Sequence, residues 1–142
     1  SSSHSSVPGM QKKGTVLIPS GPSHDPGKLH LHVVCTDPDN DGRQLIVSIC
    51  TKINNLCDPS CTLQPHEHPF LIKESYVLYR KAEVVQQSAL TNGVAANLFV
   101  PKEDMNGQTF LRITKGICTS IQTPRRIKKY FGCPEPAPAA AP

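Results

Sequence analysis

Long apolar runs are absent from this sequence, so we expect no membrane-spanning helix and no membrane partner. No apolar region of the kind found in signal peptides lies near Met10, so we expect a cytoplasmic protein. Also missing are a Walker-type phosphate loop, a dinucleotide-binding glycine motif, a Ser-His-Asp signature and a strong carboxylate pair. No common catalytic motif therefore assigns the function, which has to be inferred from weaker patterns.

Acidic residues are absent from residues 105–133, and the net charge of the whole chain is +4. The six basic residues of this segment leave a net charge of −2 for the rest of the chain. They are Arg112, Lys115, Arg125, Arg126, Lys128 and Lys129. A segment of one sign beside a nearly neutral body suggests a polyanionic partner, and a solvated helix face is the alternative.

The length of 142 residues predicts one domain, which we place at residues 10–133. Residues 1–9 are rich in serine and lack an apolar pattern, so we interpret them as added residues ahead of a natural start at Met10. Residues 134–142 alternate proline with alanine and include one glutamate, a composition that predicts a disordered tail.

Six cysteines lie at positions 35, 50, 57, 61, 118 and 133. Cys35 and Cys50 fall inside apolar, strand-like segments, where a buried thiol acts as a small hydrophobic side chain. We therefore expect reduced thiols in a cytosolic protein rather than a disulfide framework.

Strand-like patterns fill the first half of the chain. Residues 29–36 alternate with period 2, and the turn formers of residues 37–42 predict antiparallel pairing with residues 44–51, which should form a central strand. Residues 14–19, 70–72 and 76–79 also read as strands. Residues 80–87 fit either a strand or the start of a helix, and residues 93–100 either a last strand or a short helix.

Helix-like patterns follow at the C-terminal end. Apolar residues recur at spacings of three and four from position 106 or 107 onward, at Phe110, Ile113, Ile117 and Ile121. A final helix is predicted by Thr123 as N-cap, Pro124 at the first helical position and Gly132 just past the end. Strands followed by helices predict a mainly β fold, a small barrel or curled sheet packed by one or two helices.

Several short motifs resemble the PemK/MazF-type toxins. They are Gly-Thr-Val-Leu at residues 14–17, Val-Val at 33–34, Leu-Ile-Val-Ser-Ile-Cys-Thr-Lys at 45–52 and Ser-Tyr-Val-Leu at 75–78. The resemblance spans residues 14–122. It implies a small SH3-like β-barrel and metal-independent cleavage of single-stranded RNA, without a cofactor, by a homodimer that an antitoxin restrains.

The resemblance also assigns site residues. A threonine ends the third strand in the family, and Thr51 matches it. A basic residue, commonly Arg followed by Pro, begins the second strand in the family. This chain departs from that pattern, with Lys28, Leu29 and His30 at the corresponding place.

Catalysis through the RNA 2′-hydroxyl needs a base, an acid and groups that hold the phosphate. His30 and His32 share one strand face and suit the acid and base roles, and Thr51 should approach them across the hairpin. The residues that we expect to bind substrate are Lys28, Lys52, Tyr76, Tyr79, Arg80, Arg125 and Arg126. An exposed strand face that happens to carry two histidines is the alternative.

A second cluster follows in the irregular segment before residue 70. His66 and His68, together with Ser75, form a second candidate centre in which Arg80 supplies the cation. Cys57, Cys61, His66 and His68 have the side chains of a zinc site, but their spacing is not that of a familiar zinc knuckle, so we expect no metal.

Three functional hypotheses remain open. The first is a toxin-like endoribonuclease, which Thr51 and the histidine pair favour. The second is a non-catalytic SH3-like module that binds nucleic acid or a protein, within a toxin–antitoxin or phage-defence system; the missing arginine favours it. The third is an adaptor stabilised by zinc at residues 57–68.

Overall fold

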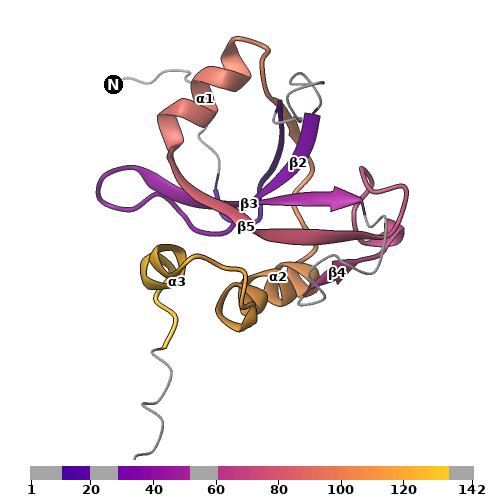
Figure 1. Ribbon diagram of the computed structural model, residues 1–142. Helices are drawn as coiled ribbons and strands as arrows, with labels where there is room; N and C mark the ends of the chain where they lie inside the picture. The colour runs from indigo at the N-terminus through magenta and orange to yellow at the C-terminus, as the bar shows by residue number, and fades with distance from the viewer. Residues whose placement is uncertain (1–10, 20–28, 52–60, 135–142) are drawn as a thin grey trace, which may run out of the picture.

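A computed structural model describes residues 11–19, 29–51 and 61–134 of the chain. Within these residues, one curled antiparallel sheet of six strands has the order β4-β5-β3-β2-β1-β6 (Figure 1). The elements in chain order are β1 Thr15–Pro19, β2 Leu29–Val34, β3 Arg43–Thr51, β4 Thr62–Leu63, the 3₁₀ turn η1 Pro65–Glu67, β5 Ser75–Gln86, α1 Gln87–Ala95, β6 Val100–Lys102, α2 Gly107–Thr119 and α3 Arg125–Phe131.

The sequence predicted the first three strands correctly. β2 pairs antiparallel with β3, with Leu31 opposite Ile49, and β3 lies in the interior of the sheet. The predicted strand at residues 76–79 is part of the much longer β5. The strand predicted at residues 70–72 is wrong, because the His68 carbonyl accepts the Leu71 N–H and closes a turn there.

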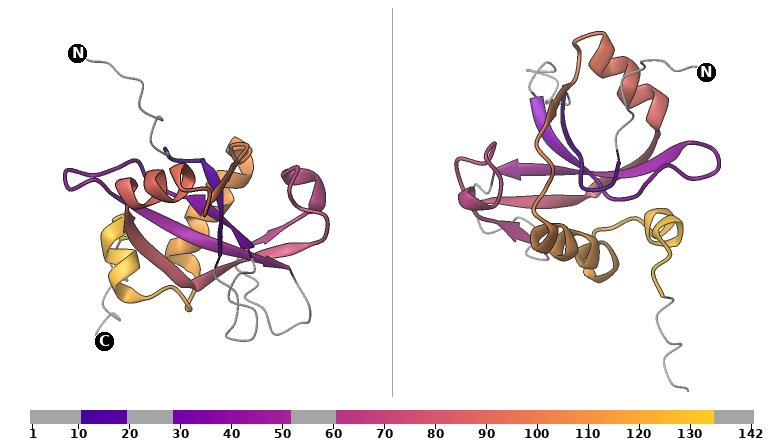
Figure 2. Two further views of the ribbon diagram at one scale, coloured as in Figure 1. Left: turned by 90° about the horizontal axis from the view of Figure 1, so that it is seen from above. Right: turned by 180° about the vertical axis from the view of Figure 1, so that it is seen from behind.

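The helices cover opposite faces of the sheet. The larger core cluster takes Leu31, Val33, Val47 and Ile49 from β2 and β3 and packs against α2 and α3. The smaller cluster takes Val34 and Ile46 from the other face and includes Leu90 of α1. Figures 1 and 2 accordingly show α1 on one side of the sheet and α2 and α3 on the other. Period-2 alternation of the strands produces these two faces.

Tyr79 anchors β5 to α2. Its side chain is fully buried, and its hydroxyl donates a 2.8 Å hydrogen bond to the Ile113 carbonyl. Gly116 permits this approach, because a Cβ at that position would lie 1.9 Å from the Tyr79 hydroxyl oxygen. Tyr79 is therefore a core residue, and its assignment to substrate binding has to be corrected.

The amphipathic stripe of α2 is confirmed at three of its four positions. Phe110, Ile113 and Ile117 are buried, but Ile121 is 96% exposed because the helix has ended at Thr119. The final helix α3 has Pro124, not Thr123, as its N-cap and begins at Arg125. The predicted stop is confirmed, because Gly132 caps the end with a left-handed φ of 88°.

Glu67 ties η1 to α2. Its carboxylate accepts hydrogen bonds from the Thr109 hydroxyl at 2.6 Å, from Arg112 Nη1 at 2.8 Å and from the Gln64 N–H at 2.7 Å. Desolvation alone would raise the pKa of Glu67, but these hydrogen bonds and the charge of Arg112 outweigh it and lower the pKa.

A disulfide joins the two C-terminal helices. Cys118, in the last turn of α2, is bonded to Cys133, two residues beyond α3. The expectation of reduced thiols is wrong for this pair, because the packing of α2 against α3 brings the two Cα atoms to 5.5 Å, a separation that a disulfide spans. Among the described residues, Cys35, Cys50 and Cys61 are reduced thiols, and Cys35 is buried as expected.

The described part of the chain contains no helix that is long and apolar enough to span a membrane. Residues 1–9 and the tail beyond Pro134 lie outside the described residues, as do Lys28, Lys52 and Cys57.

Candidate functional site

An irregularity in the pairing of β3 with β5 shapes the candidate site. Ser48 pairs with Leu78, whereas Ile46 pairs with Glu83, so four residues of β5 lie opposite Val47 alone. In a regular strand, successive side chains alternate between the two faces of the sheet. Here the consecutive residues 80–83 all border one pocket, because the extra residues bend β5 and redirect its side chains.

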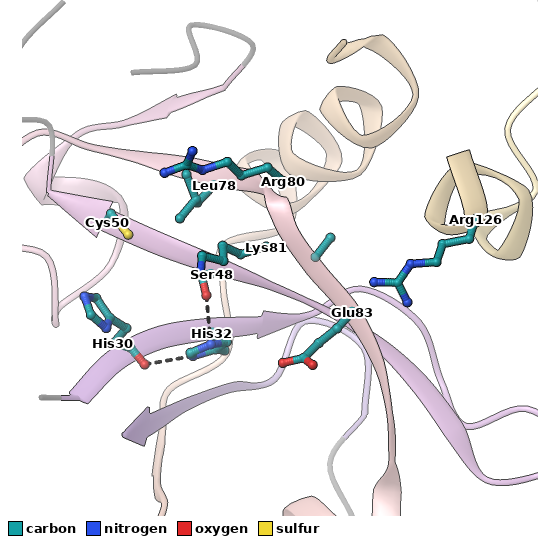
Figure 3. Close-up of a pocket in the computed structure, with 10 residues that line it drawn as sticks. His30, His32, Ser48, Cys50, Leu78, Arg80, Lys81, Glu83 and Arg126 are labelled. Atoms are coloured by element: carbon teal, nitrogen blue, oxygen red, sulfur yellow. Dashed lines mark hydrogen bonds between the residues drawn. The ribbon is translucent and has the colours of Figure 1, made fainter. Parts of the chain in front are cut away.

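The pocket has a volume of about 410 Å³, which is within the range of small-ligand sites (Figure 3). It is lined from four elements: His30 and His32 of β2, Ser48 and Cys50 of β3, Leu78, Arg80, Lys81, Ala82 and Glu83 of β5, and Arg126 of α3. Three permanent cations and one carboxylate therefore border two histidines, which makes the pocket suited to an anionic ligand.

His32 is held at both ring nitrogens (Figure 3). Its Nδ1 lies 2.9 Å from the His30 carbonyl oxygen, and its Nε2 lies 2.8 Å from the Ser48 hydroxyl. A carbonyl oxygen can only accept, so Nδ1 carries the proton. In the neutral ring Nε2 then accepts the Ser48 O–H, and the hydrogen bonds fix both the tautomer and the orientation of the imidazole.

Burial keeps this imidazole neutral. Desolvation lowers the pKa of His32 below its ordinary value, and the neighbouring His30 lowers it further, although the hydrogen bond to the His30 carbonyl acts in the opposite direction. At neutral pH His32 is therefore a base, with a lone pair on Nε2, rather than a cation.

The structure separates Thr51 from the two histidines. Leu31 pairs with Ile49 and His32 with Ser48, so the even-numbered residues of β3 share a face with His30 and His32. Thr51 is exposed at the end of β3, opposite Ser75, and does not line the pocket. Ser48 and Cys50 occupy the places beside the histidines instead.

Apart from the buried Tyr79, the predicted substrate-binding residues divide into three groups. Arg80 and Arg126 line the pocket. Tyr76 and Arg125 do not, although Tyr76 lies beside the site, opposite Cys50. Lys28 and Lys52 lie outside the described residues.

The second candidate cluster serves the fold. His68 is buried, donates through Nε2 to the Glu103 carbonyl at 2.8 Å and accepts the Phe70 N–H at Nδ1. Ser75 is also buried, and its hydroxyl donates to the Lys73 carbonyl. His66 is exposed on η1. Both ring nitrogens of His68 thus bond to backbone groups, and His68 does not line the basic pocket, so its contacts serve the fold.

The zinc alternative is weakened by the same contacts. Cys57 lies outside the described residues, and Cys61 is buried. Across residues 11–19, 29–51 and 61–134, no three histidine, cysteine or acidic side chains group as metal ligands do.

Sequence reasoning missed Ser48, Cys50 and Glu83. The hairpin register contains the signal for Ser48, since pairing residues 29–36 with 44–51 places it on the face of the histidines. For Glu83 there is no such signal. Ser48 pairs with Leu78, and regular alternation along β5 from Leu78 would place Glu83 on the opposite face of the sheet.

Fold and pocket together define a curled antiparallel sheet, covered by helices on both faces, with a basic pocket over its central strands. No family model matches the chain, and a search of curated proteins found no match.

Proposed function

We propose that this protein binds single-stranded RNA at the basic pocket and cleaves it through the 2′-hydroxyl by metal-independent acid–base catalysis. The observation that carries the proposal is His32, a neutral base of fixed orientation in a pocket that also contains His30 and three cationic side chains. Cleavage by this route requires these same three components: a base, an acid and cations for the phosphate.

His32 takes the role of base in this proposal. Its Nε2 receives the 2′-proton when the RNA hydroxyl replaces the Ser48 hydroxyl as its hydrogen-bond partner. His30, which is half-buried at the pocket wall, donates a proton to the leaving 5′-oxygen. Acid–base catalysis of this kind contributes on the order of 10²- to 10⁴-fold to a rate.

The cationic side chains hold the phosphate. Arg80 and Lys81 come from the irregular part of β5, and Arg126 comes from α3. An arginine can contact two phosphate oxygens at once, which fixes the phosphodiester as negative charge builds on it. The basic C-terminal segment thus contributes to the site through Arg126.

The resemblance to the PemK/MazF-type toxins extends the proposal to an SH3-like barrel, a homodimer and an antitoxin partner. The curled antiparallel sheet with helices on both faces supports a small barrel-like fold of this kind. The catalytic groups differ from the family pattern, because the pocket offers His30, His32 and Ser48 where the family uses an arginine and a threonine.

A cleavage assay tests the proposal. We expect single-stranded RNA incubated with the protein in EDTA to give fragments with 2′,3′-cyclic phosphate ends. The same oligonucleotide with 2′-deoxyribose throughout should bind and remain intact. His32→Asn, which retains a donor toward the His30 carbonyl but loses the base, should reduce cleavage at least about 100-fold. His66→Asn, on the exposed η1 turn, is the matched control and should cleave as the wild type does.

A non-catalytic module that binds nucleic acid is the second candidate, because the pocket cations require no chemistry of the histidines. Two neighbouring arginines give a sharp test of binding. Arg126→Gln should weaken RNA binding and reduce the slope of log K against log salt by about 1, whereas Arg125→Gln, outside the pocket, should change both less. Binding that depends on Arg126, with RNA left intact under all conditions, would establish this second function and exclude the first.

A further inference from the structure

Ser48 has the surroundings of a nucleophilic serine. Its hydroxyl donates to His32 Nε2 at 2.8 Å, and His32 Nδ1 in turn donates to the His30 carbonyl at 2.9 Å. A nucleophile beside a base, with the base oriented by a third group, is the arrangement that activates serine in hydrolases. Here a backbone carbonyl stands in the place of the usual carboxylate.

The position of this chain of hydrogen bonds is as informative as its geometry. Ser48 and His32 are 7% and 4% exposed, so both are held firmly by the sheet. Both nevertheless line the 410 Å³ pocket (Figure 3). A serine–histidine pair that served only to join β2 to β3 would not require a pocket over it.

We infer that Ser48 is a nucleophile that takes the acyl group from small carboxylic esters carrying an anionic group, and so forms a covalent acyl-serine. The pocket volume is within the range of small-molecule sites. Arg80, Lys81 and Arg126 supply positive charge for the anionic group and for the oxyanion that forms on the attacked carbonyl. This inference concerns the same pocket as the proposed function but does not depend on RNA cleavage.

The reaction balances with water as the second substrate. The Ser48 oxygen bonds to the ester carbonyl carbon while His32 Nε2 takes the serine proton. The bond from carbon to the alkoxy oxygen then breaks, and the alcohol departs with the proton from His32. Water attacks the acyl-serine, again through His32, which releases the carboxylic acid and restores the Ser48 hydroxyl.

Covalent labelling of the wild-type protein provides the test. A fluorophosphonate probe reacts with an activated serine by forming an oxygen–phosphorus bond and expelling fluoride, and peptide mass spectrometry then locates the adduct. We expect one adduct, on Ser48. Prior incubation with a 4-nitrophenyl hemisuccinate ester, whose free carboxylate suits the cations, should slow labelling and should release 4-nitrophenol in a burst that approaches one equivalent.

Matched variants separate activation from mere presence of a serine. His32→Asn should slow labelling at least about 100-fold, and Ser48→Ala should abolish it. Ser75→Ala is the control, because this buried serine lies in the neighbouring strand, has a backbone partner and lacks a histidine. The Ser75→Ala variant should be labelled on Ser48 at the wild-type rate. Circular dichroism would verify that each variant is folded. The location of the adduct in the wild-type protein does not depend on any variant.

Each result decides the inference. An adduct on Ser48 that requires His32 supports it, whether or not RNA is cleaved. No adduct, or an adduct on another residue, overturns it even if RNA cleavage is found. Labelling of Ser48 that is unchanged in His32→Asn also overturns it, because the serine would then react without activation.

Discussion

Reducing the bond between Cys118 and Cys133 should destabilise the C-terminal helices. The two residues are separated by 15 positions, and closing a loop of that length in the unfolded chain corresponds to about 3 kcal/mol of stability. After reduction α3 is still attached through buried Ile127 and through the Tyr130 hydroxyl, which lies 2.9 Å from both Asp39 Oδ2 and the Arg43 carbonyl. We therefore expect a weaker but folded protein.

Urea unfolding with and without dithiothreitol measures this difference. The free energy of unfolding should fall by about 3 kcal/mol on reduction, and a variant with Cys118→Ser and Cys133→Ser should start at the lower value and be insensitive to the reductant. Iodoacetamide should modify these two cysteines only after reduction. Modification of Cys118 and Cys133 in the unreduced, denatured protein would refute the pairing. Equal stabilities with the bond present and absent would refute the loop-closure reasoning.

Three further predictions concern the pocket and the core. The loss of labelling at low pH should have its midpoint below pH 6.5, because His32 is active when neutral and burial lowers its pKa below the ordinary value of 6.5; a pH–rate profile checks this. The titratable and charged groups that line the pocket together with His32 are His30, Cys50, Arg80, Lys81, Glu83 and Arg126. Gly116→Ala should lower the free energy of unfolding by about 3 kcal/mol, because the new methyl group would lie 1.9 Å from the Tyr79 hydroxyl and displace it. Gly107→Ala, whose new methyl group would lie 3.7 Å from its nearest neighbour, should change the free energy of unfolding little. Glu67 has a lowered pKa in the folded state, so its contribution to stability is complete above the unfolded pKa of about 4.3 and is lost as pH falls through the folded value. Acid unfolding should therefore be less pH-dependent in Glu67→Gln than in the wild type.

The parts of the fold that the sequence predicted are those with a local signal. Alternation over residues 29–36 and the turn after them determine β2, β3 and their pairing. The spacing of Phe110, Ile113 and Ile117 determines the buried face of α2 in the same way. Tyr79 was assigned wrongly because its role depends on Gly116, 37 positions away, and no local pattern reports a contact between distant elements.

The placement of Thr51 shows how a correct register can still mislead. The hairpin does bring the end of β3 near the start of β2, as predicted. Residues that pair across two strands share a face, however, and so do residues two positions apart in one strand. Thr51 therefore lies on the face of Ile49, whose side chain belongs to the larger core cluster, and not on the face of the histidines. A count of residues along β3 from Ile49 thus excludes Thr51 and selects Ser48 as the partner of His32.

The basic C-terminal segment has a narrower role than its charge alone indicates. Four cations lie in α3, yet Arg126 is the one that lines the pocket. The others include Lys128 and Lys129, which lie in the last turn, where positive charge also favours the helix dipole. The positive charge of α3 therefore has two physical roles: Arg126 contributes to the pocket, and Lys128 and Lys129 stabilise the end of a short helix. Only contacts between α3 and the irregular part of β5 distinguish the cation that can meet a bound anion from those that stabilise the helix end.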